Sequence, residues 1–162
     1  MDKQTLIKLL AYKRWADTAT LEAIKRIEPA SSAKEHHLML RLMNHIYVVD
    51  RIFRANMAGL PHGYQALNTP ETPTAEALIT AFRESTDEYI AFITTLSEDE
   101  FGKVIRFTFV DGGEGEMRLM DMVNHILFHG TYHRGAVGWL IQSCGGVAPK
   151  DVLTVFLRDY QS

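Results

Sequence analysis

Three histidines recur at four-residue steps in one stretch of the chain, NHILFHGTYHRG, residues 124–135. These are His125, His129 and His133, and the run around them is otherwise apolar with helical spacing. Each step advances about 40° beyond a full helical turn, so neighbouring imidazoles share a face and lie roughly 6 Å apart. Two adjacent imidazoles can chelate one ion, but three on a single helix cannot all reach it. The pattern predicts a metal site that needs another ligand from elsewhere.

His45 is the best candidate for that additional ligand. It belongs to a series spaced three or four apart, which predicts one buried helical stripe: Leu38, Leu42, His45, Val49 and Phe53. A second such stripe is Met122, Ile126, His129, His133, Ala136 and Leu140. A buried imidazole must be hydrogen-bonded or metallated, since leaving it unsatisfied costs on the order of 1–3 kcal/mol. Two readings follow, a metal site where the stripes meet or core histidines satisfied without an ion.

The choice of ion follows from the ligand type. Imidazoles suit Zn²⁺, Ni²⁺, Fe²⁺ or Cu²⁺ better than Mg²⁺ or Ca²⁺, and we expect a divalent transition metal, Zn²⁺ or Ni²⁺ first. A ferritin-like di-iron centre requires Glu-x-x-His motifs, and no glutamate here has histidine three residues later. Gly130 directly after His129 excludes the H-E-x-x-H pattern of metalloproteases. Three protein ligands would leave a coordination position at which water or a thiol is activated.

The elements that must position these residues are mainly helical. The first helix is expected over residues 2–27, with a stripe made of Leu9, Tyr12, Ala16, Ala19 and Ala23. Ser32 and Glu35 form a capping-box pattern that opens the second helix, which should end at Gly59. The third helix should begin at Thr72-Pro73 and run to about residue 96.

A short segment interrupts the helical pattern before the fourth helix. Residues 103–118 contain a β-branched and aromatic run followed by Asp-Gly-Gly, which predicts a small hairpin. The fourth helix should cover residues 117–144 and close at Gly145, and a short last helix should cover 151–159. The expected fold is all-α, a four-helix bundle with a small β-hairpin before the fourth long helix and a short C-terminal helix, in one domain over residues 1–162.

Composition limits the classes of partner. The chain has 162 residues, 46% of them hydrophobic, and a formal net charge of −3, which gives no basic footprint for nucleic acid. No apolar run approaches the roughly 20 residues needed to span a bilayer, and the first residues lack a signal-peptide pattern. A single cysteine, Cys144, excludes an internal disulfide. We therefore expect a cytoplasmic protein that binds neither nucleic acid nor membrane.

Nearly the whole chain resembles the DinB/YfiT-like family of metal-dependent enzymes. The matching stretches are AYKRWADTATLEAI, MNHIYVVDRIFRANMAGLP and HILFHGTYHRGAVGWLIQSCGGVAPKDVLTVFL. In that family the ion is held by a second-helix histidine and an H-x-x-x-H pair followed by Arg-Gly. Spacing alone does not choose between the pairs 125/129 and 129/133, but the Arg134-Gly135 match favours the later one. The resemblance thus implies the ligand set His45, His129 and His133, although Ala136 replaces the family's usual Gln.

The resemblance also implies an activity. Some relatives are transferases or isomerases that employ a low-molecular-weight thiol, which suggests a metal-dependent thiol transferase or isomerase acting on a small-molecule substrate. Activation of water, as in a hydrolase, is the other use of such a site. The alternative from another class is a non-catalytic, stress-related protein that binds a small ligand and uses the metal structurally. A homodimer is compatible with the resemblance.

Five further residues are assigned to the pocket or to the surroundings of the ligands: His125, Asp50, Arg134, Tyr132 and Trp15. Asp50 either orients a ligand imidazole or pairs at the surface with Arg51 or Arg54. Arg134 either binds the carboxylate of an anionic substrate or is a solvated helix residue. The two aromatic residues either roof the pocket or belong to the core.

Overall fold

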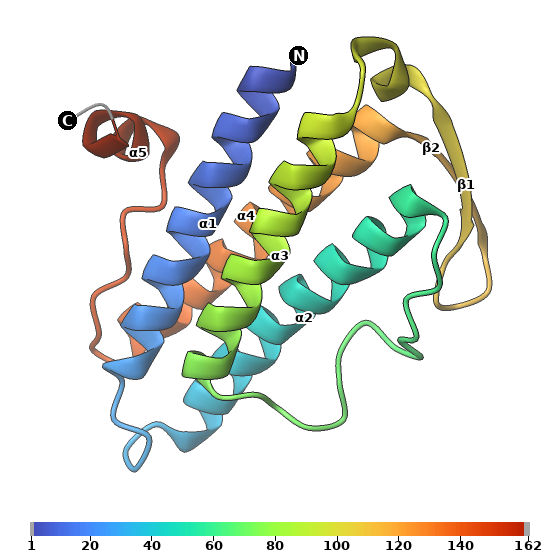
Figure 1. Ribbon diagram of the computed structural model, residues 1–162. Coiled ribbons are helices and arrows are strands. Elements are labelled where there is room, and N and C mark those ends of the chain that lie inside the picture. The colour runs from blue at the N-terminus through green and yellow to red at the C-terminus, as the bar shows by residue number, and fades with distance from the viewer. Residues whose placement is uncertain (1, 161–162) are drawn as a thin grey trace.

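Four long helices lie side by side in the computed structural model, which describes residues 2–160 (Figure 1). They are α1 (Lys3–Lys25), α2 (Ala33–Ala58), α3 (Ala75–Thr95) and α4 (Leu119–Ser143). The shorter elements are the 3₁₀ turn η1 (Glu98–Gly102), strands β1 (Val104–Thr108) and β2 (Glu114–Arg118), and helix α5 (Leu153–Tyr160). The expected all-α bundle, with a hairpin before the fourth long helix and a short helix after it, is confirmed. Across residues 2–160, none of the helices is both long and apolar enough to traverse a bilayer.

Local signals explain most helix ends. Gly59 closes α2 in the left-handed conformation, with φ of 67°, as its glycine predicts. Ser32 does precede α2, but its side chain makes no capping hydrogen bond, so the expected capping box is absent there. The start predicted for α3 was too early, because the hydroxyl of Thr74 accepts a 3.2 Å hydrogen bond from the Ala77 amide and sets the start at Ala75.

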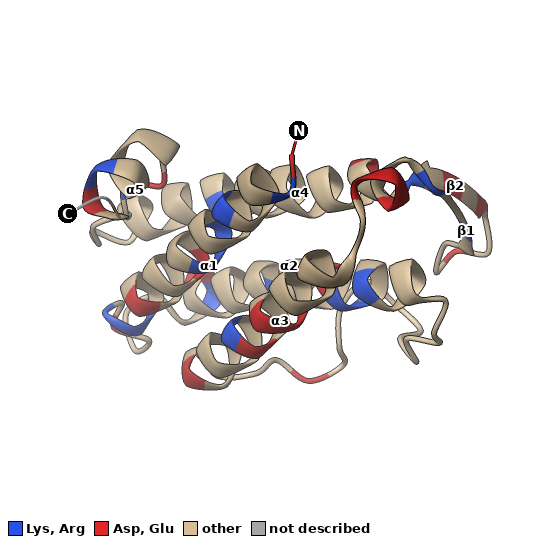
Figure 2. Cartoon of the chain, turned by 45° about the horizontal axis from the view of Figure 1, so that its top comes forward, with Lys and Arg blue, Asp and Glu red and all other residues tan. Residues whose placement is uncertain are grey.

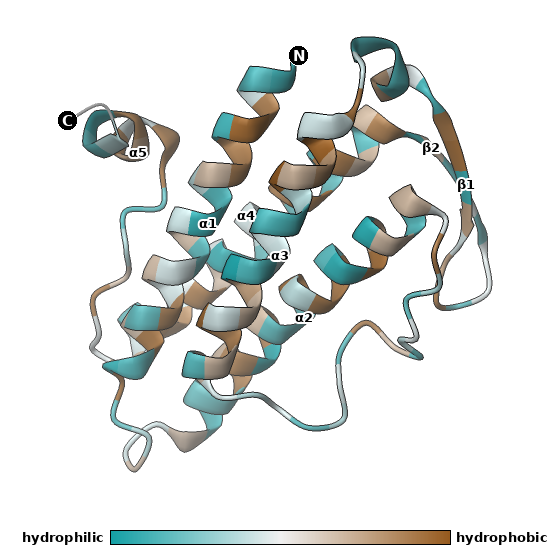
Figure 3. Cartoon of the chain, in the orientation of Figure 1, coloured by the Kyte–Doolittle hydropathy of each residue, from teal (hydrophilic) through white to brown (hydrophobic). Residues whose placement is uncertain are grey.

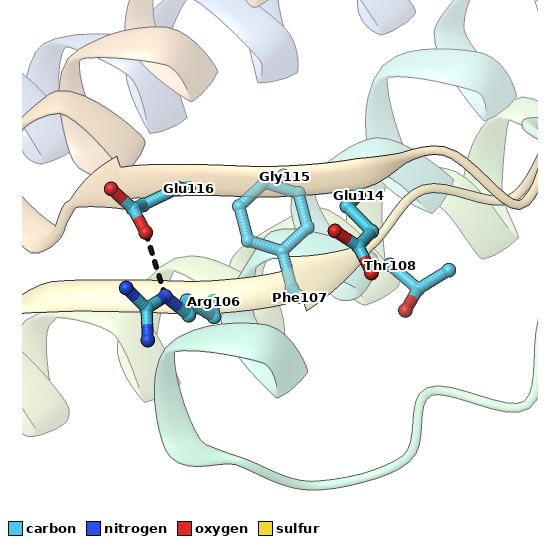
Figure 4. Close-up of a pocket in the computed structure, with 6 residues that line it drawn as sticks. All are labelled: Arg106, Phe107, Thr108, Glu114, Gly115 and Glu116. Atoms are coloured by element: carbon cyan, nitrogen blue, oxygen red, sulfur yellow. Dashed lines mark hydrogen bonds and ion pairs between the residues drawn. The ribbon is translucent and has the colours of Figure 1, made fainter.

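The hairpin pairs β1 with β2 in antiparallel register, Ile105 opposite Met117 and Phe107 opposite Gly115. The Phe107 ring reaches across the ladder over Gly115 (Figure 4), where an added Cβ would lie 2.6 Å from the ring. Phe107 also packs against Phe53 of α2, with ring centroids 5.9 Å apart. The hairpin is therefore attached to the bundle through its aromatic side chain.

The four long helices form two layers. Helix α1 packs against α3 and α4, and α2 packs against α4 and α3. Figure 2 shows α1 with α4 in one layer and α2 with α3 in the other. Apolar residues concentrate on the facing sides of the helices (Figure 3) and form two buried clusters. One cluster includes Leu10, Phe53 and Tyr89, and the other includes Ile24 and Phe82.

A polar layer separates these two apolar clusters. Its members are buried side chains from all four long helices: Lys13, Asp17, Asp50, Ser85, Thr86 and Arg134. On α1, for example, the layer falls between Leu10 of one cluster and Leu21 of the other. The core of this bundle is therefore apolar at both ends and ionic in the middle.

The buried faces of α1 and α2 are rotated relative to the predicted stripes. On α1 the buried face is Leu6, Leu10, Lys13, Asp17, Thr20 and Ile24. On α2, Leu38 is 45% exposed, and Met39, Met43 and Ile46 are buried instead. Of the predicted α1 stripe, Ala16 and Ala23 are buried, but Leu9, Tyr12 and Ala19 are only partly so. The predicted face omitted the charged residues Lys13 and Asp17, which neutralise each other inside the bundle.

Candidate metal centre

Three imidazoles from two helices converge at one place beside the bundle core. His45 comes from α2, and His129 and His133 come from successive turns of α4. One ring nitrogen from each of them lies within 4.8 Å of the others. The shortest separation joins Nε2 of His129 to Nε2 of His45, at 3.0 Å. The structure thus brings together the three residues that the sequence singled out.

The backbone of the loop after α2 determines which nitrogen of His45 faces the cluster. Nδ1 of His45 lies 2.7 Å from the carbonyl oxygen of Leu67. Because a carbonyl oxygen only accepts, Nδ1 carries the hydrogen, and the lone pair of the neutral ring is on Nε2. That lone pair points to His129. A hydrogen bond from the second ring nitrogen to a carbonyl is the usual support of a metal-binding histidine.

The other two imidazoles are kept neutral by their surroundings. Burial, together with the smaller effects of the neighbouring His133 and His45, lowers the pKa of His129 to about 3. Burial, with a smaller effect of His45, also lowers the pKa of His133. Metal ligation requires the neutral imidazole, so both rings are in the binding form at neutral pH.

The donor set fits a divalent transition-metal ion. With Zn–N bonds of about 2.0–2.1 Å, nitrogens of a tetrahedral site lie roughly 3.3 Å apart. The observed separations, from 3.0 Å to at most 4.8 Å, bracket that value. Nδ1 of His129 is buried and has no hydrogen-bond partner among residues 2–160, so Nε2 makes the only hydrogen-bond contact of this ring in that range. The group can bind a metal ion, and its geometry does not select one metal.

His125 stands beside this cluster and is not part of it. Its ring stacks on Phe53, with centroids 4.5 Å apart and planes 17° apart, and on His129 at 5.4 Å. Burial lowers the pKa of His125 as well. Because Phe53 also contacts Phe107, an aromatic row runs from the hairpin to the candidate ligands. Phe53 and Phe107 were not predicted as neighbours of the site.

The predicted alternative of a surface ion pair between Asp50 and Arg51 or Arg54 is wrong. The carboxylate of Asp50 is buried, and its Oδ2 lies 2.5 Å from Nζ of Lys13 on α1. Lys13 also donates to Asp17, at 2.8 Å. Burial raises the pKa of Asp50 to about 7, and Lys13 opposes the shift. Burial acts to lower the pKa of Lys13, but Asp17 and Asp50 outweigh it and keep the ammonium charged.

Both alternatives predicted for Arg134 are wrong, because its guanidinium is buried and paired with carboxylates of the chain itself. It is 2% exposed, and its Nη1 binds Asp17 at 2.9 Å while its Nε binds Asp151 at 2.7 Å. Tyr12 donates its hydroxyl to the same Asp151 carboxylate, at 2.5 Å. Arg134 therefore joins α4 to α1 and to the segment that precedes α5.

Gly130 allows these charges to pack directly under the candidate ligands. An added Cβ would lie 2.9 Å from Nη1 of Arg134 and 3.2 Å from Cε of Lys13. Both side chains are held by ion pairs, so neither can easily withdraw. A glycine next to His129 is therefore required for the contact between α1 and α4 at this level.

The two aromatic residues assigned to the pocket have different surroundings. The Tyr132 ring is 77% exposed and stands edge-on to His133, with centroids 5.1 Å apart. Trp15 packs against Tyr12 and Phe156, with centroids 6.1 and 5.8 Å apart, so it joins α1 to α5. Tyr132 borders the candidate site, and Trp15 is explained by packing. The hollow drawn in Figure 4 is lined by the hairpin residues 106–108 and 114–116, which include none of the candidate ligands.

A four-helix bundle with three converging imidazoles defines a class of candidate metal-binding protein. The chain belongs to the DinB family, whose family model matches residues 1–159. This confirms the family resemblance found in the sequence. No curated protein matches the chain. Family membership and the histidine cluster agree with a metal-binding role.

Proposed function

We propose that the protein is a metal-dependent enzyme of the thiol transferase or isomerase type, with His45, His129 and His133 as the metal ligands. The observation that carries this proposal is the 3.0 Å contact between Nε2 of His129 and Nε2 of His45. Two imidazoles that meet through these nitrogens can share one hydrogen or one cation. A third imidazole within 4.8 Å makes the cation the better occupant.

The three-residue ligand set supports catalysis over a purely structural ion. Structural zinc sites are closed by four protein ligands, whereas catalytic sites keep one position for a small molecule. Here the His/Cys/Asp/Glu group found among residues 2–160 has three members, and each of the three is partly exposed. A bound ion would supply Lewis acidity and lower the pKa of a thiol or water admitted beside it.

The chain's own residues then hold and shield the reacting molecule. Tyr132 stands edge-on to His133 of the cluster, and the stacked rings of Phe53 and His125 adjoin His129. The Leu67 carbonyl fixes the orientation of His45. Asp50 is buried and its Oδ2 is held by Lys13, so it does not offer an accessible carboxylate base for hydrolysis, which favours thiolate chemistry.

Metal analysis of the purified protein tests the ligand assignment. We expect about one Zn²⁺ or Ni²⁺ per chain in the wild type and strong loss in His45→Ala, His129→Ala and His133→Ala, because each removes one of three ligands. His125→Ala should retain the ion, since that ring only stacks on its neighbours. His37→Ala, an exposed histidine on α2, is the matched control. Unchanged metal in His45→Ala, or loss only in His125→Ala, would overturn the assignment.

An activity assay separates the enzyme from a non-catalytic ligand-binding protein. Glutathione, bacillithiol and coenzyme A are each offered with a panel of electrophiles, and thiol consumption is followed. We expect activity that chelation abolishes and Zn²⁺ or Ni²⁺ restores. If the metal-loaded protein binds its ion through the three histidines but stays inert with every thiol and releases no hydrolysis product, the alternative of a small-ligand-binding protein with a structural metal is favoured.

A further inference from the structure

Helix α4 turns an uncharged aromatic face to the solvent. Phe128, Tyr132 and Trp139 are 72%, 77% and 73% exposed, and Gly135 lies exposed between them. We call these four residues the aromatic stripe. From residue 122 to residue 148 the chain has a single Lys, Arg, Asp or Glu, which is the buried Arg134. Figure 2 accordingly shows α4 tan over most of its length.

Such a face needs an explanation because soluble helices normally expose charged residues opposite their buried side. Contiguous exposed apolar patches mark interaction surfaces. Here three large rings share one side of α4, because their positions differ by four, three and four residues once Gly135 is included. That side is adjacent to the face that carries the candidate ligands, since Tyr132 directly precedes His133.

The spacing of the aromatic stripe reads the same in both directions. Steps of four, three and four residues are unchanged when the helix is reversed. An antiparallel copy of α4 would therefore place its Trp139 against Phe128 and its Gly135 against Tyr132, and the same contacts would repeat on the other side. This is the self-complementarity that a two-fold symmetric interface requires.

We infer that two copies of this chain associate through the aromatic stripe, with their α4 helices antiparallel across a two-fold axis between Tyr132 and Gly135. In this arrangement each Tyr132 ring fills the space left by the missing side chain at the partner's Gly135. Phe128 stacks on the partner's Trp139 at both ends of the contact. The pairing does not rest on the proposed enzyme function, because it is argued from α4 surface residues and requires no metal, although Tyr132 also borders the candidate site.

The aromatic stripe supplies much of the area that a stable dimer requires. A fully exposed aromatic side chain presents about 150–250 Å², so three rings that are each about three-quarters exposed bring on the order of 900 Å² to a symmetric pair. Stable interfaces bury about 1,200–2,000 Å² in total. The exposed residues flanking the stripe on the same helix, Thr131, Ala136 and Gln142, would supply the remainder.

Gly135 is the most specific part of the inference. A Cβ at this position would meet no atom of the chain within 4 Å, so contacts within one copy do not require glycine there. Glycine inside a helix is about 1 kcal/mol less favourable than alanine. A close approach by a second helix accounts for a glycine at the centre of an aromatic surface.

Sedimentation equilibrium of the metal-free and metal-loaded protein tests the pairing. We expect the wild type to reach twice the monomer mass of 18.4 kDa as concentration rises. Gly135→Gln should fold normally, as far-UV circular dichroism will show, but its side chain occupies the space for the partner's Tyr132. Trp139→Lys places two like charges in the interface. Each variant should raise the dissociation constant about tenfold or more.

Ala77→Gln, at an exposed position of α3 in the other layer, is the matched control and should dimerise like the wild type. In a Trp15→Phe background the emission of Trp139 should shift to longer wavelength on dilution, as its ring returns to water. A wild type that remains monomeric at every concentration overturns the inference, whether the stripe binds another molecule or none. A dimer that Gly135→Gln and Trp139→Lys both leave intact also overturns it, because the interface then lies elsewhere.

Discussion

Replacing Lys13 with methionine should destabilise the protein strongly, although the substitution is close in shape. Among residues 2–160, the ammonium of Lys13 is the single cation within hydrogen-bond distance of the Asp50 carboxylate, at 2.5 Å, and one of two that pair with Asp17. All three side chains of this contact are at most 3% exposed. Asp17 would keep Arg134 at 2.9 Å, but Asp50 would lose its counter-ion, and its Oδ1 already has no partner among the described residues.

The expected loss follows from the cost of a buried unpaired charge. Removing one partner of a buried pair costs about 3–5 kcal/mol, which in a chain of this size lowers the melting temperature by roughly 6–20 °C. Asp50 can reduce this cost by binding a proton, since burial already raises its pKa to about 7. Because the pKa of Asp50 is higher in the folded state than its unfolded value of 3.8, the folded state binds more protons at pH values between the two. The stability of Lys13→Met should therefore fall as pH rises from about 4 through 7 and beyond.

Urea unfolding at pH 5.5 and pH 8 measures both effects. Lys13→Met should be less stable than the wild type at each pH, with the larger deficit at pH 8. Adding Asp50→Asn removes the unpaired charge and should recover more than half of the loss at pH 8, with little gain at pH 5.5. Lys8→Met, at an exposed position of the same helix, should change the free energy of unfolding by less than about 0.5 kcal/mol. If Lys13→Met lies within 1 kcal/mol of the wild type, or Asp50→Asn rescues nothing, the ion pair does not have the role argued for it.

Two further predictions concern α4, the helix that carries two of the candidate ligands. Gly130→Ala should lower the free energy of unfolding, because the new Cβ would lie 2.9 Å from Nη1 of Arg134. Gly138→Ala should raise it by about 0.5–1 kcal/mol, because its Cβ would meet its nearest neighbour at 3.7 Å. Equal effects in thermal unfolding would contradict the packing argument. In metal-free protein the free energy of unfolding should fall as pH drops from about 6.5 toward 3. In this range His129 binds a proton in the unfolded state, whereas in the folded state its pKa of about 3 keeps it unprotonated. His129→Asn should reduce this slope, and His125 and His133, whose pKa values burial also lowers, should account for the remainder. An unchanged slope would contradict the role of His129.

The position of the histidine cluster was predictable because two periodic patterns converged on it. The H-x-x-x-H spacing predicts adjacent turns of one helix face, and His45 lies in a second amphipathic segment whose end at Gly59 is set by local backbone chemistry. Spacing alone did not choose between the pairs 125/129 and 129/133. That choice depends on the distance across two helices, which is a tertiary property. Ligation by these residues stays a prediction until metal is measured.

The ionic layer was missed because charge was taken as a sign of exposure. Lys13 and Asp17 have the i, i+4 spacing of an ion pair, and they continue the spacing of Leu6 and Leu10. These two observations together indicate a buried pair on the core face. The sequence could not show that Asp50 and Arg134 come from other helices to complete it, because such partners depend on how the helices pack. For the same reason, the sequence placed Asp50 beside a ligand imidazole or at the surface, and predicted a substrate carboxylate or solvent as the partner of Arg134.

The ionic layer also fixes how α2 and α4 are rotated about their axes. Each of these helices has a candidate ligand followed five residues later by a buried ion, His45 with Asp50 on α2 and His129 with Arg134 on α4. Five residues correspond to about 140° of rotation, so the histidine lies at the edge of the buried face when the charge points inward. Both inward charges bind α1, Asp50 through Lys13 and Arg134 through Asp17. Any rotation that separated the imidazoles would break a buried ion pair, so α1, which supplies no ligand, holds the two ligand helices in register.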